Sequence, residues 1–406
     1  MKRLFTYMPT LLITIFLMWS VSLSAQEGES AEEDSLMSVP EAKDSLQVSL
    51  ITCSPGTDIY AMYGHTAIRV VNFPTHLDLV FNYGMFNYNA DSFVFKFLEG
   101  KTDYILGVEP GQGFFQRYGD KGNEVVEQIL NLTQEECRIV FDKLMENAAP
   151  ENRMYRYNWL YNNCTTRARD VLESAINGDI EYTTSQKPLT VRQILHRFTC
   201  MNSWIEFGAD LILGAEIDTL VSSRIQMFIP SVYENEADSA FIVKAGGMKI
   251  PLVADKQTVL EPKNELEADT SHSPFICFLI ILIAVIVISI YEIKRSKTYK
   301  WIDVSLSILQ GLAGTLVAFL FFLSVHAGVD SNVLVILLNP LAFVWIYFYT
   351  VRRPKVPAYA TLAELLLLVL TLCVIPQHIH GAVIPLALIL MVRAVVNLVI
   401  AKKQIV

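Results

Sequence analysis

A cysteine begins a predicted helix in the segment Tyr161-Asn162-Asn163-Cys164-Thr165-Thr166-Arg167. Apolar residues at helical spacing continue this helix to about Ile176, and Gly178 ends it. The asparagine before Cys164 is a favoured N-cap residue. At a helix N-terminus, the dipole and the free backbone N–H groups favour a thiolate, and the same N–H groups can bind the oxyanion of an acyl intermediate. We therefore interpret Cys164 as a candidate nucleophile.

A nucleophilic cysteine needs a base, and residues 49–254 offer three histidines: His65, His76 and His196. His65 lies midway along a predicted strand, which holds a side chain more rigidly than a loop does, and Gly64 leaves room beside it. His76 lies in a turn near a proline, and His196 has the ordinary spacing of an amphipathic helix. The sequence therefore favours His65 as the base.

The charge of the chain is divided unevenly along its length. Its 406 residues carry a formal net charge of −9, yet the mean hydropathy is +0.36 and 52% of the residues are hydrophobic. Residues 26–273 contain 20 basic and 37 acidic side chains, a net charge of −17, and the remaining residues contain 12 and 4, a net charge of +8. This division excludes a single soluble globule and indicates an acidic aqueous domain joined to an apolar membrane domain. Because an acidic domain repels phosphate, we expect no nucleic-acid partner.

The C-terminal third contains apolar segments of roughly 20 residues, the length that crosses a bilayer. Five such segments are present: Pro274–Tyr291, Val304–Val325, Val333–Tyr349, Ala358–Pro376 and Ala382–Ile400. Clusters of Lys and Arg follow the first, third and fifth segments, whereas the loops after the second and fourth contain neither. The positive-inside rule assigns the clusters to the cytoplasm, so residues 26–273 face outward.

The N-terminus has the pattern of a secretory signal, with Lys2 and Arg3 before an apolar run and small residues up to Ala25. We expect cleavage near Gln26, and an uncleaved anchor is the alternative. The predicted organisation is then a signal at 1–25, a disordered acidic segment at 26–48, an outer domain at 49–254, a linker at 255–273 and a membrane domain at 274–406.

Polar residues also fall within or beside the predicted spans. His326, His378 and His380 lie at the outer ends of the second and fourth spans, where they form either an interfacial loop or a polar mouth for a substrate. Arg393 lies inside the fifth span, and an intramembrane charge indicates either a function or an internal ion pair.

The outer domain combines alternating strands with amphipathic helices. Thr133 opens one helix and has Glu136 three residues later, which is a capping box. The domain therefore belongs to the α+β class, with an antiparallel sheet and helices packed on it. The expected strands are Ala61–Asn72, Leu79–Phe86, Thr102–Val108 and Glu124–Asn131, and the expected helices include 133–147, 164–176, Val191–Phe198 and Ser203–Gly214.

Four cysteines fall in the outer domain: Cys53, Cys137, Cys164 and Cys200. Two disulfides would be the ordinary arrangement outside the cytoplasm. The position of Cys164 at a helix N-terminus fits a disulfide poorly, so we expect Cys164 to be free and Cys53 to be structural or disulfide-bonded.

Several residues near the two motifs are candidates for orienting the base or binding a substrate. Asn82, on the adjacent predicted strand, is a candidate to orient His65. Arg167 and Arg169 could bind a lipid phosphate, or they could lie on a solvated helix face. Asn163, Tyr63 and Tyr161 flank the motifs as further candidate substrate contacts, and the two tyrosines are equally good core aromatics.

The order of a strand histidine before a helix Asn-Cys pair resembles the permuted branch of the papain-like, NlpC-type thiol superfamily. A longer set of motifs resembles the Lnb N-terminal periplasmic domain of Bacteroidetes lipoprotein N-acyltransferases. The motifs are Leu50–Gly56, Tyr63-Gly64-His65, Phe81-Asn82-Tyr83-Gly84, Tyr161–Arg167 and Met227-Phe228-Ile229-Pro230. The resemblance implies a permuted papain-like periplasmic domain with a C-terminal bundle of five transmembrane helices, and it assigns the nucleophile to Cys164 and the base to His65.

The resemblance also implies an activity, its partners and a location. A phospholipid would donate a fatty acyl chain through a Cys164 thioester to the α-amino group of a diacylglyceryl lipoprotein. The reaction would take place in the bilayer of the bacterial inner membrane, with the catalytic domain on the periplasmic side.

The run that contains Met227 and Phe228 is a candidate lid over the thiol. The alternatives are a membrane-anchored cell-wall peptidase or amidase and a non-catalytic membrane scaffold. We expect no cofactor and no metal, because no residues have zinc-ligand spacing in the outer domain and His378-x-His380 is too sparse a motif.

Overall fold

The computed structural model describes residues 45–403, apart from residue 57 and segments 87–91, 184–187, 200–202 and 264–272. The predicted signal at 1–25 lies outside the described residues, as does nearly all of the predicted acidic segment. Residues Lys43–Val406 form one compact unit that contains both the outer domain and the membrane helices.

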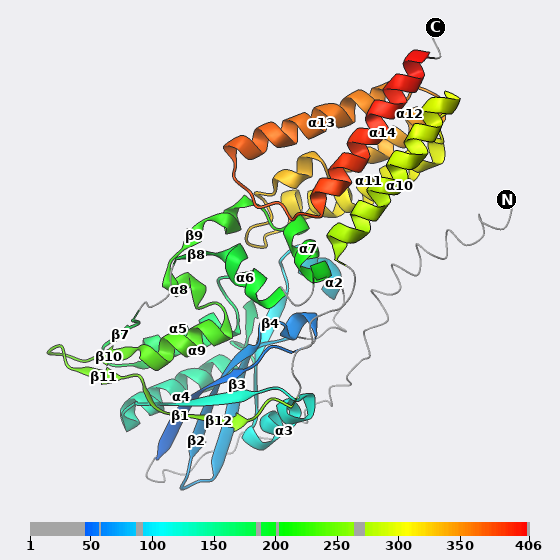
Figure 1. The fold of residues 1–406 in the computed structure, drawn as a ribbon. Coiled ribbons are helices and arrows are strands. Elements are labelled where there is room, and N and C mark those ends of the chain that lie inside the picture. The colour runs from blue at the N-terminus through cyan, green and yellow to red at the C-terminus, as the bar shows by residue number, and fades with distance from the viewer. Residues whose placement is uncertain are drawn as a thin grey trace. The chain divides into compact units, whose positions relative to one another are not determined.

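A seven-stranded antiparallel sheet forms the centre of the outer domain (Figure 1). Its strand order is β12-β5-β1-β2-β3-β4-β6. The strands are β1 (Leu46–Cys53), β2 (His65–Asn72), β3 (Leu77–Met85), β4 (Asp103–Pro110), β5 (Val125–Leu130), β6 (Met154–Arg156) and β12 (Val253–Leu260). Two small sheets join β7 (Asp179–Glu181), β10 (Phe241–Val243) and β11 (Lys249–Pro251), and β8 (Leu189–Thr190) with β9 (Leu220–Val221).

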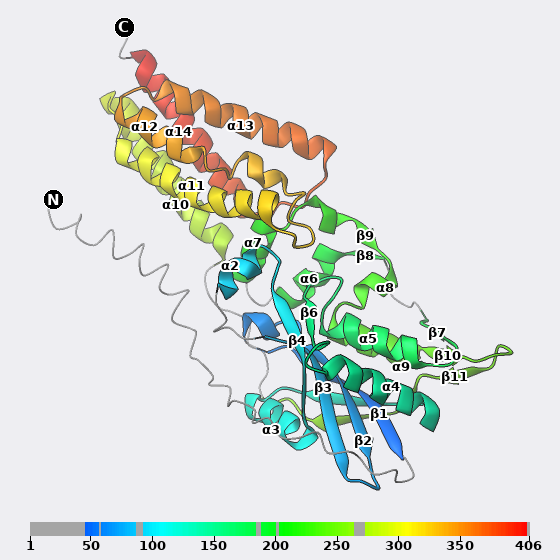
Figure 2. The same cartoon turned by 180° about the vertical axis from the view of Figure 1, so that it is seen from behind.

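Helices cover both faces of the large sheet. On one face, Val48, Leu50 and Ile68 pack with apolar residues of two neighbouring helices, which lie along the sheet in Figure 2. On the other face, Ile51 and Ala67 pack with another helix. The first two helices are α4 (Gln134–Ala148) and α5 (Cys164–Ala175), and the third is α3 (Gly111–Lys121). The mixed α+β class predicted from the sequence is confirmed.

The other described helices of the outer domain are short. They are η1 (Ile59–Ala61), α2 (Phe93–Leu98), α6 (Val191–Thr199), α7 (Ser203–Ile212), η2 (Ala215–Asp218), α8 (Ser223–Gln226) and α9 (Pro230–Ser239). The predicted capping box of Thr133 and Glu136 is present at the start of α4.

Two predicted boundaries are wrong. Residues 46–48, predicted as the end of the disordered acidic segment, are the start of β1 and are mostly buried. Residues 255–260 were assigned to the linker, but they belong to β12, which pairs with β5 at the edge of the sheet. Most residues of β12 are exposed, and the strand contains Asp255, Lys256 and Gln257. An exposed edge strand has the polar composition of a linker, so composition alone did not distinguish the two.

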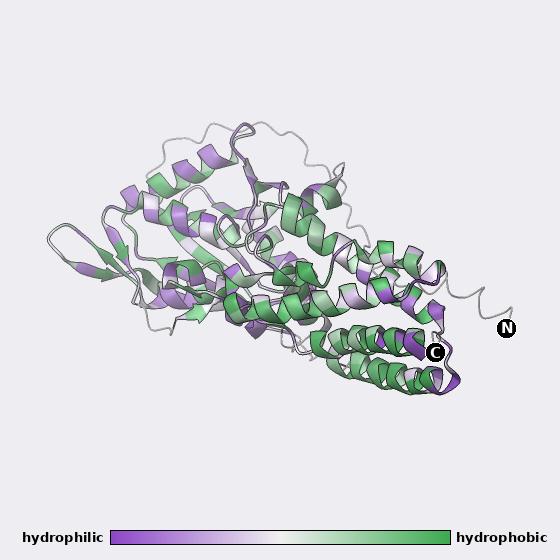
Figure 3. Cartoon of the chain, turned by 90° about the horizontal axis from the view of Figure 1, so that it is seen from above, coloured by the Kyte–Doolittle hydropathy of each residue, from purple (hydrophilic) through white to green (hydrophobic). Residues whose placement is uncertain are grey.

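Four described helices are long and apolar enough to cross a membrane: α10 (Pro274–Arg295), α11 (Lys300–Leu323), α13 (Lys355–Val374) and α14 (Val383–Lys403). Figure 3 shows that these helices are predominantly hydrophobic along their length. The third predicted span differs, because Val333–Tyr349 is divided between the 3₁₀ turn η3 (Val333–Ile336) and the nine-residue helix α12 (Ala342–Thr350).

The break in the third segment has a local cause. Pro340 has no N–H to donate, and it disfavours helical geometry at Asn339. The carbonyl groups freed by the break are bonded instead, because Gln310 Nε2 donates to Leu337 O at 2.8 Å and Asn339 Nδ2 donates to Ile336 O at 2.8 Å. Backbone at membrane depth requires such partners, since lipid offers none.

Arg393 pairs internally, as one of the two sequence interpretations expected. Its guanidinium donates to Asp303 of α11 at 2.8 and 2.9 Å and also bonds Glu292 of α10. All three side chains are buried, and Asn397 donates to Asp303 at 3.1 Å. The network therefore joins α10, α11 and α14.

We expect Arg393→Leu to destabilise the protein strongly, because it leaves two carboxylates buried without their cation. Loss of one partner from a buried ion pair costs about 3–5 kcal/mol. Thermal unfolding of the purified protein in detergent measures the effect. The matched control is Lys402→Leu, which removes an exposed charge from the same helix and should leave the Tm nearly unchanged; equal Tm values for the two variants would contradict the structural role of Arg393.

Candidate functional site

Cys164 is the first residue of α5, and Asn163 caps the helix. The Asn163 side-chain oxygen accepts hydrogen bonds from the backbone N–H groups of Thr165 and Thr166, each at 2.9 Å. In return, the Thr166 hydroxyl accepts a hydrogen bond from the Asn163 backbone N–H at 2.8 Å. This cap fixes the backbone on both sides of the thiol. It also uses two of the first-turn N–H groups that the sequence had left free for an oxyanion.

The same asparagine anchors the helix to two other segments. Asn163 Nδ2 donates to Trp159 O at 2.8 Å and to Phe228 O at 2.9 Å. Asn163 is buried, and both polar atoms of its side chain are engaged, so its predicted role as a substrate contact is not supported. Met227 and Phe228, predicted as part of a lid, are also buried, and the Asn163 bond to Phe228 O holds this run against the start of α5.

His65 is the first residue of β2, where it is paired with Cys53, the last residue of β1. Gly64 precedes it with a φ of +79°, and a side chain there would meet the Cys53 carbonyl oxygen at 2.6 Å. A glycine is therefore required at the close approach that leads into the histidine.

A hydrogen bond between two threonines joins β2, the strand of the base, to α5, the helix of the nucleophile. The hydroxyls of Thr66 and Thr165 are 3.1 Å apart, and both residues are fully buried. Thr66 follows His65, and Thr165 follows Cys164. This contact therefore fixes the distance between the two chemically active residues.

A polar chain extends from His65 across the sheet. His65 Nε2 is 3.2 Å from Asn82 Oδ1, and Asn82 Nδ2 donates to Glu109 Oε1 at 2.8 Å. Glu109 is in turn bonded to the guanidinium of Arg117 on α3, with Nη2 at 2.7 Å. The bond to Asn82 engages Nε2 and leaves Nδ1 as the ring nitrogen available to the thiol. The structure thus brings together Cys164, His65 and Asn82, the three residues predicted as catalytic.

The two active groups change each other's proton affinity. Burial alone would raise the pKa of the Cys164 thiol, but the charge and hydrogen bond of His65, with a hydrogen bond from the Thr66 backbone, lower it below the ordinary thiol value. Burial alone would lower the pKa of His65, but the Cys164 thiolate and Asn82 raise it above the ordinary imidazole value. Both shifts favour a thiolate–imidazolium pair.

The space beside the thiol depends on Gly84, which has a φ of +94°. A side chain there would begin 3.7 Å from the Cys164 Cβ and 4.0 Å from the hydroxyl of Tyr155. That hydroxyl is buried and has no hydrogen-bond partner among the described residues. Sequence analysis had not singled out Tyr155, Glu109 or Arg117, since none has a local motif.

The remaining predicted contacts differ in exposure. Tyr161 is 55% exposed in the turn before α5, and Tyr63 is partly buried edge-on against Phe198 at 5.7 Å between ring centroids. Arg167 lies over the Tyr155 ring at 4.5 Å. By contrast, Arg169 is buried and donates to the Arg224 carbonyl, so it has a structural role.

Cys53, Cys137 and Cys164 are all free cysteines. The expectation that Cys53 is either structural or disulfide-bonded is therefore resolved in favour of a buried free thiol. Cys200 lies outside the described residues. Burial raises the pKa of Cys53 far above the ordinary thiol value, which keeps this neighbour of the site protonated.

Comparison with known protein families gives two matches. The Lnb N-terminal periplasmic domain matches residues 41–197, and the Lnb transmembrane domain matches residues 266–405. The chain belongs to the Lnb family. The two matches together span most of the chain and place the Cys164–His65 pair in the periplasmic domain of a multi-pass membrane protein. Comparison with curated proteins and with solved structures found no match.

The lowered pKa of Cys164 predicts rapid alkylation of the Lnb-family thiol. We expect iodoacetamide to modify Cys164 at a pH where an ordinary thiol is still protonated, with the rate rising as the pH passes the lowered pKa. His65→Ala removes the main stabilising charge, so the pKa should rise and the rate at neutral pH should fall about tenfold for each unit of the rise. Mass spectrometry of the labelled peptide over a pH series measures both effects.

The matched control for this experiment is His76→Ala, which removes an exposed histidine from the β2–β3 turn. This variant should give the unaltered pH profile. An unaltered profile for His65→Ala as well would show that the imidazole does not stabilise the thiolate.

Proposed function

We propose that this protein transfers a fatty acyl chain from a membrane phospholipid to the α-amino group of the lipidated N-terminal cysteine of a lipoprotein. The observation that carries the proposal is the polarised pair of Cys164 and His65, oriented by Asn82, in a domain joined directly to apolar membrane helices. The proposed location is the bacterial inner membrane, with the site on its periplasmic side. Membership of the Lnb family supports this class of activity.

In the first half of the reaction, His65 holds the thiol proton and the Cys164 thiolate attacks an ester carbonyl of the phospholipid. The tetrahedral intermediate collapses, its carbon–oxygen ester bond breaks, and His65 returns the proton to the departing alkoxide. The products are a lysophospholipid and an acyl thioester on Cys164.

In the second half, the lipoprotein amine attacks the thioester carbonyl. The carbon–sulfur bond breaks, an amide forms, and the amine's proton passes to His65, which restores the thiolate–imidazolium pair. An amine attacks a thioester far more readily than an ester, so the thiol intermediate makes amide formation feasible. Water must be excluded, since it would hydrolyse the same intermediate.

Two donors near the thiol are suited to the oxyanion of both tetrahedral intermediates. Because Asn163 occupies the N–H groups of Thr165 and Thr166, the first-turn donor that remains is the N–H of Cys164 itself. The second donor is the hydroxyl of Tyr155, which is buried beside Gly84 without a partner among the described residues. Preorganised donors of this kind stabilise the charge that develops during acyl transfer.

A row of apolar side chains extends from helix α2 into the outer domain. Helix α2 exposes Val94, Phe95 and Phe97, and the Phe95 ring lies 5.6 Å from that of Phe319 on α11.

From α2, ring contacts continue through Phe93, Phe86 and Tyr104 to Tyr157, with centroid separations of 5.5, 4.8 and 4.1 Å. Burial and then the charge of Cys164 raise the pKa of Tyr157, and both side chains pack against the same hydrophobic core. An apolar row suits a fatty acyl chain.

Cys164→Ala should abolish N-acylation, because no other group replaces the thiolate as acyl carrier. The measurement is mass spectrometry of mature lipoproteins from cells in which this protein is the sole N-acyltransferase. Lipoproteins that keep their N-acyl chain in the variant would overturn the proposal. Accumulated cross-linked cell-wall fragments would instead indicate a cell-wall amidase, and an unchanged lipid profile and cell wall would indicate a scaffold. The matched control is Cys373→Ala, which removes an exposed cysteine of α13 and should leave acylation intact.

Phe95→Asp should slow formation of the acyl-enzyme from phospholipid in vesicles, because a charge on α2 opposes contact with the apolar phase. Alkylation of Cys164 by a small soluble reagent should be unchanged, since the site itself is intact. Phe73→Asp is the matched control: Phe73 is 57% exposed in the β2–β3 turn, against 55% for Phe95. Equal acylation rates for the two variants would show that α2 does not serve lipid access.

A further inference from the structure

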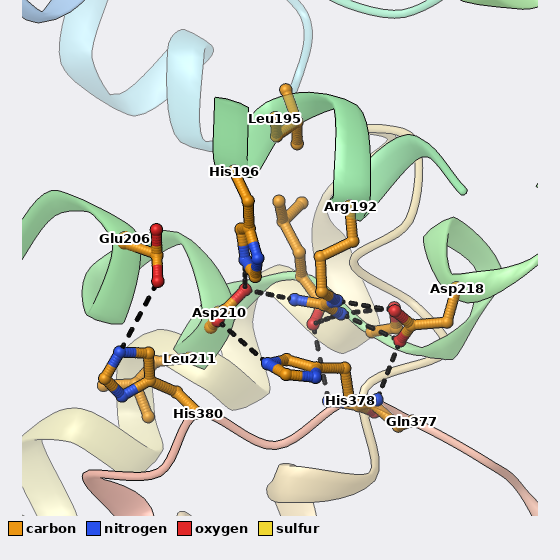
Figure 4. A network of polar contacts seen from close by, with 12 residues as sticks. Arg192, Leu195, His196, Glu206, Asp210, Leu211, Asp218, Gln377, His378 and His380 are labelled. Atoms are coloured by element: carbon orange, nitrogen blue, oxygen red, sulfur yellow. Dashed lines mark hydrogen bonds and ion pairs between the residues drawn. The ribbon is translucent and has the colours of Figure 1, made fainter. Parts of the chain in front are cut away.

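A second polar cluster lies between the outer domain and the loop that joins α13 to α14. It contains His196 from α6, Asp210 from α7 and His378 from the loop, whose side chains point toward one another in Figure 4. The Nε2 atom of His196 is 3.0 Å from Asp210 Oδ1, and Nε2 of His378 is 3.7 Å from Asp210 Oδ2. The candidate ligand atoms of the three residues all lie within 4.8 Å of one another.

One oxygen of the cluster is buried without a hydrogen-bond partner among the described residues. The Asp210 side chain is 1% exposed, and its Oδ2 has no hydrogen-bond partner among the described residues. Its other oxygen, Oδ1, accepts a hydrogen bond from Arg192 Nη1 at 2.6 Å. An anionic oxygen buried without a donor is costly, so Oδ2 is poised to receive a cation that reaches the cluster.

We propose that His196, Asp210 and His378 bind a divalent transition-metal ion of the zinc class. Two imidazoles and one carboxylate are a usual ligand set for zinc, with a further position left for water. A tetrahedral zinc with ligands about 2.0–2.1 Å away places its ligand atoms roughly 3.3 Å apart, so the observed spacing requires only a small movement of the loop histidine. The His378 side chain is 51% exposed, which gives the ion a path from solvent.

The charges around the cluster suit a cation despite the nearby guanidinium. Arg192 is already paired, because Nε donates to Asp218 at 2.7 Å and Nη2 donates to the carbonyls of Leu213 and Gly214. Among the residues labelled in Figure 4, carboxylates come from Asp210, Asp218 and Glu206, and Arg192 is the one cation that does not depend on protonation. Its bond to Oδ1 also orients the carboxylate, as outer partners of metal ligands commonly do: Oδ1 lies 3.0 Å from His196 Nε2, and Oδ2 lies on the side of His378, 3.7 Å from its Nε2.

Such an ion would fasten the membrane domain to the catalytic domain. His378 belongs to a loop between two membrane helices, whereas His196 belongs to a helix of the outer domain. Phe198, two residues after His196, packs on Tyr63, which lies two residues before His65. The ion would therefore fix the α13–α14 loop against the helix that supports the base.

The sequence had suggested no metal, because it offered no cluster with zinc spacing. The ligands come from three segments that only the fold brings together. His378-x-His380 is not itself the site, since His380 lies 3.9 Å from Glu206 rather than with the other ligands.

The test uses the full-length protein in detergent, stripped with a chelator and then reloaded with zinc or cobalt salts. We expect about one zinc ion per chain to be retained after desalting, and cobalt to give the visible absorption of a low-coordinate site with nitrogen and oxygen ligands. His196→Ala and His378→Ala should each weaken binding about tenfold or more. Elemental analysis and a cobalt titration measure these effects.

The matched controls are His380→Ala and His326→Ala, which remove histidines from the same loop and from the loop after α11. Both should bind the metal as the unaltered protein does. Zinc should also raise the Tm of the unaltered protein but not that of His378→Ala, whose own fold is checked by an unchanged Tm in chelator. The proposal is overturned if the unaltered protein retains no zinc, or if His196→Ala and His378→Ala retain as much as it does; the cluster would then be an ion pair only.

Discussion

The side chain of Asn163 is the constraint on which the catalytic geometry depends. It closes the first turn of α5 through Thr165 and Thr166 and ties that turn to the carbonyls of Trp159 and Phe228. The Cys164 side chain is therefore held in one direction, toward His65 at the start of β2. An alanine in place of Asn163 would free a buried helix terminus and leave the two carbonyls without their donor, so the position of the thiol would no longer be defined.

The polar chain from His65 through Asn82 and Glu109 to Arg117 affects the charge of the imidazole as well as its orientation. Asn82 is neutral, so it can hold the imidazole without neutralising the positive charge that stabilises the thiolate. The charge of Glu109 is directed to Arg117 instead, one step further from the reacting atoms. A carboxylate at position 82 would pair directly with the imidazolium and raise its pKa further, which would make His65 a poorer proton donor in the proposed reaction.

The parts of this structure that the sequence predicted are those with a local signal. The start of α5, the capping box of α4 and the long apolar runs of the membrane domain depend on neighbouring residues. Strand β1 gives only a short signal, because both of its faces are buried and the alternation of apolar and polar residues over Leu46–Leu50 is interrupted at Ile51. The Thr66–Thr165 contact and the cluster at Asp210 join distant segments, so only the fold could reveal them.

Backbone hydrogen bonds dock the outer domain on the membrane domain, which a single-helix anchor would not do. Val325 donates to Glu99 O at 2.9 Å, and Gly214 donates to Gly328 O at 2.6 Å, so loops at the outer ends of the membrane helices bond the outer domain directly. A tether would let the thiol sample many orientations above the bilayer. A docked domain instead presents one face to lipids that are confined to a plane. For the proposed reaction, this would lower the entropic cost of bringing the thiol to the ester and then the amine to the thioester. A reaction between two membrane-bound substrates gains from this arrangement at both steps, whereas hydrolysis of a soluble substrate would gain little.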